Sequence, residues 1–238
     1  MIASPLTTQI AFMAGPVPVS TIVVTTWAVM AVLLLGAVLI GRHLRLIPGP
    51  AQAVAELLVE AIDDQIAATV EASPAPYRVL IGTLFIFIFT CNWSSLVPGV
   101  EPPTAHLETD AALAALVFVA TVWHGLRAHG PLGYLRTFAQ PSWVMIPLNL
   151  VEQLTRTLSL TVRLFGNVMS GVFVIGIIGL LAGLLVPIPL MALDMLTGAV
   201  QAYIFAVLAM VFIAAAVSEG HSPRPAQPTT PATEKDSP

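Results

Sequence analysis

The chain has 238 residues, of which 57% are hydrophobic and 9% are charged, and its formal net charge is −4. Soluble domains carry about 25% charged residues, so this composition excludes a soluble globular protein. It predicts instead an all-α, polytopic membrane protein with about five transmembrane helices. The sequence contains no nucleotide-binding, zinc-protease or nucleophile-elbow motif. The chain therefore has no visible motif of its own for binding a nucleotide, and we expect no cofactor, no metal and no nucleic-acid partner.

The first part of the chain predicts one span and one surface helix. Residues 1–18 are expected to form an outer N-terminal segment, and an apolar run over 19–40 is the first span, ending just before Arg42. A Pro-Gly-Pro sequence at 48–50 then breaks the chain. The helix expected over 51–71 carries several acidic residues and is too charged to cross a membrane, so we expect it to lie along the membrane surface.

The middle of the chain predicts two further spans. Apolar residues over 77–95 form the second span, and those over 111–126 form the third. Prolines between these spans enforce a loop over 96–109. Another loop is expected over 127–141, where glycine and proline residues recur.

Two long helices are expected in the last part of the membrane domain. As a continuous helix, residues 142–186 would be about 67 Å long, whereas the hydrocarbon core is about 30 Å thick. This segment is therefore either strongly tilted, which we favour, or a hairpin broken at Gly166 or Gly171. The last span, over 190–217, is also long and expected to be tilted. The proline- and threonine-rich residues 222–238 predict a disordered cytoplasmic tail.

Basic residues indicate how the membrane domain, residues 19–221, is oriented. Arginines flank the connection after the first span and occur in the 127–141 loop and the tail. The 96–109 loop and the turn at 187–189 have none. With five crossings, the positive-inside rule places the N-terminus outside and the C-terminus in the cytoplasm, in a cell (inner) membrane.

A narrow polar stripe runs along the 142–186 segment. At about 100° per residue, its members fall within an arc of about 60–80° on a helical wheel whose remainder is mostly Leu, Val and Thr. They are Asn149, Glu152, Arg156, Ser159, Arg163, Asn167 and Ser170. A charged side chain at the bilayer centre costs about 2.5–3.5 kcal/mol, so this stripe indicates a site that handles charge inside the membrane.

Arg163 is the central cation of the stripe. Glu152, the nearest acid on its face, is about 16 Å away along the helix axis and has the spacing of a pair with Arg156. Arginine keeps its proton, so an unpaired Arg163 would attract a carboxylate and prevent ions from slipping past. The alternative is a structural ion pair between Arg163 and Asp194.

The last helix has a second polar face, formed by Asp194, Thr197, Gly198 and Gln201. An antiparallel turn before this helix would bring Gln201 near Arg163. Alternatively, Gln201 and Thr197 form hydrogen bonds that hold neighbouring helices together. Asp194, closer to the outer surface, is either a hydrated interfacial residue or a proton relay.

Polar groups are thus expected to approach Arg163 from both membrane faces. Glu152 and Ser159 lie on the inner half of the stripe, whereas Asp194 lies on the outer half. The sequence shows no obvious path that joins the two sides. This layout suggests two offset half-channels with a positive gate between them.

The run SLTVRLFGNVMSG, followed by QAYIFAVLAMVFIAAAVSEGH, resembles subunit a of F-type rotary ATP synthases, and the resemblance covers most of Tyr77–His221. It implies that Arg163 is the stator arginine, facing a rotor ring of c subunits whose carboxylates carry H⁺ or Na⁺ between the half-channels. Gln201 is then the glutamine near this arginine, and the inner half-channel includes Glu152, Ser159 and Asn167. Peripheral-stalk b subunits and, indirectly, a soluble ATPase head are the further implied partners, and the resemblance implies that the chain itself is a non-catalytic, ion-translocating subunit.

The sequence departs from the pattern of this family at one position. Many relatives carry an acid where this chain has Val172, paired with a His or acid at the position of Asp194. The outer half-channel is then expected to be mainly water-lined or to use other polar residues, namely His106, Glu108, Asp110 or His124. This departure indicates a divergent branch of the family.

Two other classes of function compete with this interpretation. A stand-alone ion channel or secondary transporter would usually be built from internal repeats, but the sequence shows none, and five spans cannot be divided into two equal halves. A purely structural membrane subunit would not explain an unpaired central arginine.

Overall fold

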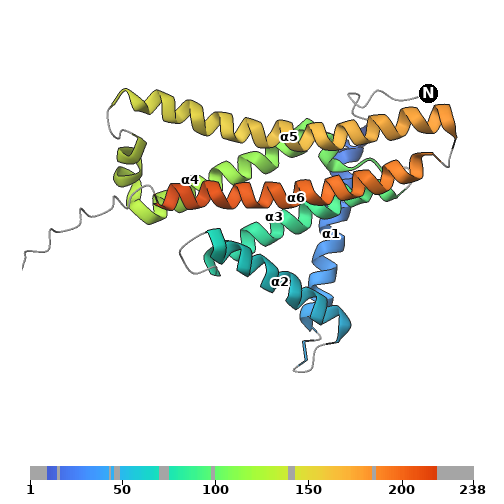
Figure 1. Ribbon diagram of the computed structural model, residues 1–238, viewed down its shortest axis with the longest axis horizontal. Helices are drawn as coiled ribbons and strands as arrows, with labels where there is room; N and C mark the ends of the chain where they lie inside the picture. The colour runs from blue at the N-terminus through green and yellow to red at the C-terminus, as the bar shows by residue number, and fades with distance from the viewer. Residues whose placement is uncertain are drawn as a thin grey trace, which may run out of the picture.

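The structure is a computed structural model, and it describes residues 10–14, 17–42, 44–45, 49–69, 75–97, 100–138, 143–183 and 186–218. The predicted tail, residues 222–238, lies outside the described residues, as do residues 1–9 of the N-terminal segment. Within the described ranges the fold is dominated by six α-helices (Figure 1). They are α1 (Thr21–Arg42), α2 (Pro50–Thr69), α3 (Ala75–Trp93), α4 (Leu107–Phe138), α5 (Met145–Ala182) and α6 (Pro187–Ser218).

Five of these helices, all except α2, are long and apolar enough to cross a membrane. The predicted all-α membrane architecture is therefore confirmed. Helix α2 differs from the other five because it carries several acidic residues, and for this reason the sequence analysis excluded it from the spans. Large apolar side chains such as Leu34, Leu158 and Leu181 are exposed on the surface, which suits a chain whose outer face meets lipid.

Short elements precede and connect the helices. Before α1, strands β1 (Ile10–Ala14) and β2 (Val17–Ser20) pair antiparallel, a hairpin that the sequence analysis did not foresee. Single 3₁₀ turns at Ser94–Leu96 and Pro103–Ala105 lie between α3 and α4. The second turn begins at a proline, the residue that this position favours.

The loop expected over 127–141 is wrong for most of its length, because α4 continues to Phe138. The helix changes direction at Gly130, whose φ of 72° is a value that mainly glycine adopts. Pro131 then begins the second helical part. The returning part packs closely on the first. A β-carbon added at Gly125 would lie 2.8 Å from Cδ2 of Tyr134, so only glycine leaves room for that ring.

Helix α5 is continuous through Gly166 and Gly171, so the alternative of a broken hairpin is excluded. Its 38 residues make a rod about 57 Å long, well over the thickness of a hydrocarbon core. Helices α5 and α6 run antiparallel along the bundle, and α1 stands at a steep angle to them (Figure 1). Because the 22 residues of α1 suit an upright span, upright placement of α1 would leave α5 and α6 strongly tilted, as predicted.

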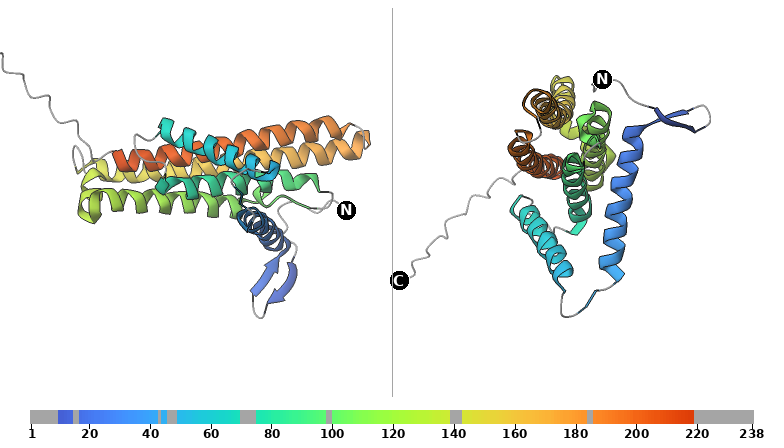
Figure 2. Two further views of the ribbon diagram at one scale, coloured as in Figure 1. Left: turned by 90° about the horizontal axis from the view of Figure 1, so that it is seen from below. Right: turned by 90° about the vertical axis from the view of Figure 1, so that its right-hand side faces the viewer.

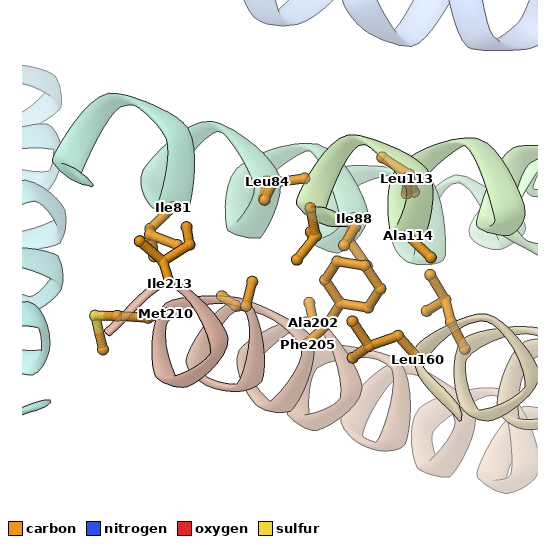
Figure 3. Packing of buried hydrophobic residues seen from close by; sticks show 14 of the residues in the cluster. Ile81, Leu84, Ile88, Leu113, Ala114, Leu160, Ala202, Phe205, Met210 and Ile213 are labelled. Carbon is orange, nitrogen blue, oxygen red and sulfur yellow. The ribbon is translucent and has the colours of Figure 1, made fainter. Parts of the chain in front are cut away.

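Helices α3 to α6 form a bundle, seen end-on in Figure 2, with α5 at the edge opposite α2. Its core contains side chains from α3, α4, α5 and α6 (Figure 3), and α6 contacts each of the other three helices. Small residues of α6, including Ala202, Ala206 and Ala209, are buried and let neighbouring helices approach closely. This packing fixes which face of α5 is free.

Candidate functional site

The polar stripe of α5 lies on a free face of the bundle. Arg163, Glu152 and Ser159 are exposed, whereas Leu160 and Leu164 point into the core. Asn167 is half-buried, and the backbone carbonyl oxygen of Asn167 accepts a hydrogen bond of 2.8 Å from the Ser170 hydroxyl. Most of the stripe therefore lies where the bundle leaves α5 uncovered; the helical wheel groups these residues on one face, but it does not predict which way that face points.

A groove of about 550 Å³ runs along the first half of this face. Its polar lining comes from α5, and Leu208 and Phe212 of α6 form part of its apolar wall. The polar residues are Glu152, Thr155, Arg156, Ser159 and Arg163. Glu152 and Ser159, the two residues expected in an inner half-channel, therefore share one groove that extends to Arg163.

The two arginines of this groove differ in their partners. Arg156 forms an ion pair with Glu152, one turn away, and its guanidinium carbon lies 5.5 Å from the centre of the Phe212 ring. Arg163 forms no ion pair with any acid in the described part of the chain. As the spacing predicts, Glu152 is taken by Arg156, and Arg163 keeps an unneutralised charge.

Asp194 is half-buried and lies against α5 at Gly171 rather than at Arg163. A β-carbon added at Gly171 would be only 2.6 Å from Cγ of Asp194, and closer still to its Oδ1. Gly171 is eight residues, about 12 Å, beyond Arg163 on the same helix. The alternative of a structural Arg163–Asp194 pair is therefore not what the structure shows.

The polar face of α6 beyond Asp194 turns into the bundle. Gln201 is buried, and no described residue hydrogen-bonds its Nε2. One turn earlier, the carbonyl oxygen of Gly198 accepts a hydrogen bond of 2.8 Å from the side-chain amide of Asn92 on α3. The Thr104 hydroxyl in turn donates to the Asn92 side-chain oxygen at 2.7 Å. Asn92 thus joins α3, α6 and the 3₁₀ turn before α4.

The acids and histidines expected in the outer half-channel do not gather around Asp194. Glu108 is exposed, and in the described residues no hydrogen bond or ion pair links it or His106 to Asp194. His106 is half-buried, with Nε2 3.5 Å from Oε2 of Glu101. That distance allows an ion pair, although the geometry does not meet that of a hydrogen bond.

His124, the last of these candidates, faces a neighbouring helix instead of the stripe. Its Nδ1 lies 2.8 Å from the carbonyl oxygen of Ala120, and its ring packs 5.3 Å from the ring of Tyr77 on α3, centre to centre. These contacts give His124 a packing role between α3 and α4.

The sequence analysis named Asp110 as a candidate but did not predict whether its side chain is buried. It is completely buried, and neither carboxylate oxygen has a hydrogen-bond partner among the described residues. A signal was available, because Asp110 shares a helical face with the buried residues Leu113, Ala114 and Val117. The periodicity of α4 thus marks Asp110 as an inward-facing acid.

Comparisons with known proteins agree with the fold and the composition. The profile of the family described as ATP synthase A chain matches residues 23–214. "ATP synthase subunit a 2" of Bradyrhizobium sp. is 50% identical, over 91% of this chain and 97% of that relative. "ATP synthase subunit a" of Albidiferax ferrireducens is 43% identical, over 89% and 92%, and "ATP synthase subunit a 2" of Pelobacter propionicus is 45% identical, over 89% and 92%.

These matches confirm the resemblance seen in the RLFGN and QAYIF motifs, and they extend it over the first span. They also confirm that the chain is a non-catalytic part of a larger complex. The stand-alone channel or transporter loses its support, since the relatives are named as subunits of ATP synthase. The chain belongs to the ATP synthase A chain family, as a multi-pass subunit of the membrane sector of that enzyme.

Proposed function

We propose that this chain is the stator subunit through which ions reach and leave the rotor ring of c subunits. Two offset half-channels connect the membrane faces to rotor carboxylates, and Arg163 separates them. Each carboxylate is neutralised from one side, rides with the ring and releases its ion on the other side. Ion flow is thereby coupled to ATP synthesis or hydrolysis in the soluble ATPase head.

The observation that carries this proposal is the position of Arg163. Its side chain is exposed on the free face of α5 and has no ion pair within the described residues. An unneutralised cation on a membrane helix is costly unless an acid from elsewhere meets it. A rotor carboxylate that passes the free face would supply that acid, and the fixed charge would block a direct leak of cations.

The groove on α5 supports the inner half-channel. It places Glu152 and Ser159 on one path toward Arg163, with Arg156 held aside by its pair with Glu152. Asn167, one turn beyond Arg163, lies beside the position where a carboxylate would pair. On the outer side, Asp194 and Gln201 are the residues of α6 that we assign to the ion path, with His106 and Glu108 nearer the outer loop.

The complex supplies the other partners. We assign the free face of α5 to the c-ring, and contact with peripheral-stalk b subunits and, indirectly, the ATPase head follows from the family resemblance. The N-terminus lies outside and the C-terminus in the cytoplasm, in a cell (inner) membrane, as the arginine distribution favours.

Arg163→Ala tests the proposal directly, with Arg156→Ala as its matched control. Arg163→Ala should abolish ion-driven ATP synthesis in inverted membrane vesicles, while the complex still assembles and its head still hydrolyses ATP. Arg156→Ala should be much milder, because Arg156 already has a partner in this chain. Coupled synthesis that survives in Arg163→Ala would refute the gating role, and equal losses in both variants would mean that the wrong arginine is assigned.

A further inference from the structure

We propose that Glu101, His106 and Asp110 form the outer path by which protons reach the depth of Arg163, with Asp110 as the innermost proton-carrying acid. This inference rests on the proposed function and names residues that the polar stripe does not include. Its evidence comes from α4 and the turn before it.

The burial of Asp110 is the first observation. Its exposed fraction is 0%, and neither of its oxygens is hydrogen-bonded by any described residue. A bare carboxylate charge in such surroundings is very costly, so the group is stable there only with a cation bound to it. A buried acid without a structural partner is therefore suited to holding and releasing a positive ion.

Side-chain exposure falls stepwise from the outer loop to Asp110. The side chain of Glu101 is 65% exposed, and His106, whose Nε2 lies 3.5 Å from it, is 11% exposed. Asp110 follows His106 by four residues, and its backbone N–H donates to the carbonyl oxygen of His106 at 3.3 Å. His106 has an extended backbone (φ −117°, ψ 127°) directly before α4, and its carbonyl oxygen accepts one of the first hydrogen bonds of the helix whose first turn contains Asp110. Three ionisable side chains thus lead from the surface into the bundle.

The inner end of this series lies near the depth of Gln201. The hydrogen bonds of Asn92 place Thr104 and Gly198 at one level. From that region α4 and α6 run in the same direction (Figure 1). Asp110 is the fourth residue of α4, and Gln201 is three residues after Gly198, so each lies about 4–5 Å further in. Both side chains are buried, and both contain atoms without a hydrogen-bond partner in the described part of the chain.

Arg163 lies at a similar depth. Helix α5 runs antiparallel to α6, with Gly171 beside Asp194 at one point and Arg156 beside Phe212 at another. Interpolation between these contacts sets Arg163 opposite the region of Ala202 to Phe205, less than about two turns from Gln201. A proton held by Asp110 has therefore already crossed the outer part of the bundle.

The histidine in this series favours a proton as the ion. Histidine accepts a proton at one ring nitrogen and releases one from the other. In each transfer His106 takes a proton from the outer side and passes one to the Asp110 carboxylate. Asp110 then gives its proton toward the rotor carboxylate and becomes ionised again, so one proton moves and both groups are restored.

Asp110→Asn tests the path, and Glu60→Gln, at an exposed acid on α2 away from the proposed ion path, is the control. The assays are ATP synthesis driven by a proton gradient in inverted vesicles, and passive proton flux after the soluble head is stripped. Asp110→Asn should lower both rates by at least about tenfold, the scale on which positioned proton carriers act. Glu60→Gln should stay within about twofold of the natural chain, and Asp110→Glu should restore part of the loss.

Normal proton flux in Asp110→Asn would overturn the inference, and so would an equal loss in Glu60→Gln. If Asp110→Asn fails to assemble, His106→Gln supplies the same test at the preceding step. A parallel measurement with ²²Na⁺ checks the ion: loss of Na⁺ flux with unchanged proton flux would refute the proton assignment. Arg163→Ala separates the two proposals. If it abolishes coupling while Asp110→Asn is normal, only the path fails; if it leaves coupling intact, the proposed function itself fails.

Discussion

Gly171→Ala is the sharpest structural test of how Asp194 is held. The added methyl would lie 2.6 Å from Cγ of Asp194, whereas unstrained carbon atoms stay about 3.5–4.0 Å apart. The Asp194 carboxylate must therefore move by about 1 Å or more. Overpacking of this kind costs about 1–3 kcal/mol, partly offset by the roughly 1 kcal/mol that alanine gains over glycine in a helix.

The net loss of stability should therefore be modest, and the functional loss should be larger because the carboxylate is displaced. We expect Gly171→Ala to assemble and to slow ion-driven ATP synthesis several-fold in vesicles. Gly176→Ala on the same helix is the matched control, since an added β-carbon there meets nothing within 4 Å. Gly176→Ala should be neutral or slightly stabilising.

A double-mutant comparison tests whether the clash with Asp194 causes the losses expected for Gly171→Ala. If the clash with Asp194 is responsible, Gly171→Ala should lower the thermal stability of the purified complex only while Asp194 is present. In the Asp194→Ala background the same substitution should have little effect, because the clashing atoms are gone. Equal and additive effects in both backgrounds, or a Gly171→Ala variant with unchanged synthesis and stability, would refute this reasoning.

Two further predictions concern α3 and α6. Asp194→Asn should slow ion entry and thus ion-driven ATP synthesis, with hydrolysis by the detached head unchanged; an unaltered synthesis rate would leave Asp194 as an interfacial residue. Asn92→Ala removes one hydrogen bond to Gly198 and one from Thr104, both buried, and should destabilise the subunit by about 2–4 kcal/mol, measured as a lower yield and lower thermal stability of the complex. Thr104→Val, which removes only one of these bonds, should lose about half as much, and equal losses would argue against the three-part contact.

The architecture was predictable where a single physical demand decides it. A bilayer requires apolar runs of about 20 residues, so the five spans could be found, and the acids of α2 exclude it from them. The polar stripe of α5 could be found from helical periodicity, but the direction in which it faces depends on how α4 and α6 pack against α5.

Features that depend on contacts between distant segments were not predictable in the same way. The Gly130–Pro131 sequence is typical of a loop, yet here it bends a helix whose second part packs on Gly125 through Tyr134. The hairpin before α1 depends on pairing between two short strands with little periodic signal. The periodicity of α4 puts Asp110 on the face of the buried apolar residues, but its complete burial also depends on how α5 and α6 pack against α4.

The length of α5 determines how many rotor helices the polar stripe could meet in the proposed contact with the c-ring. The stripe from Glu152 to Ser170 extends for about 27 Å, whereas packed helices have axes about 8–10 Å apart. A rod lying aslant the rotor rim would therefore cross several rotor helices at once instead of following one. One rotor subunit could then take up an ion while a neighbouring subunit releases one, with Arg163 between the two. Each step of ring rotation would exchange their roles.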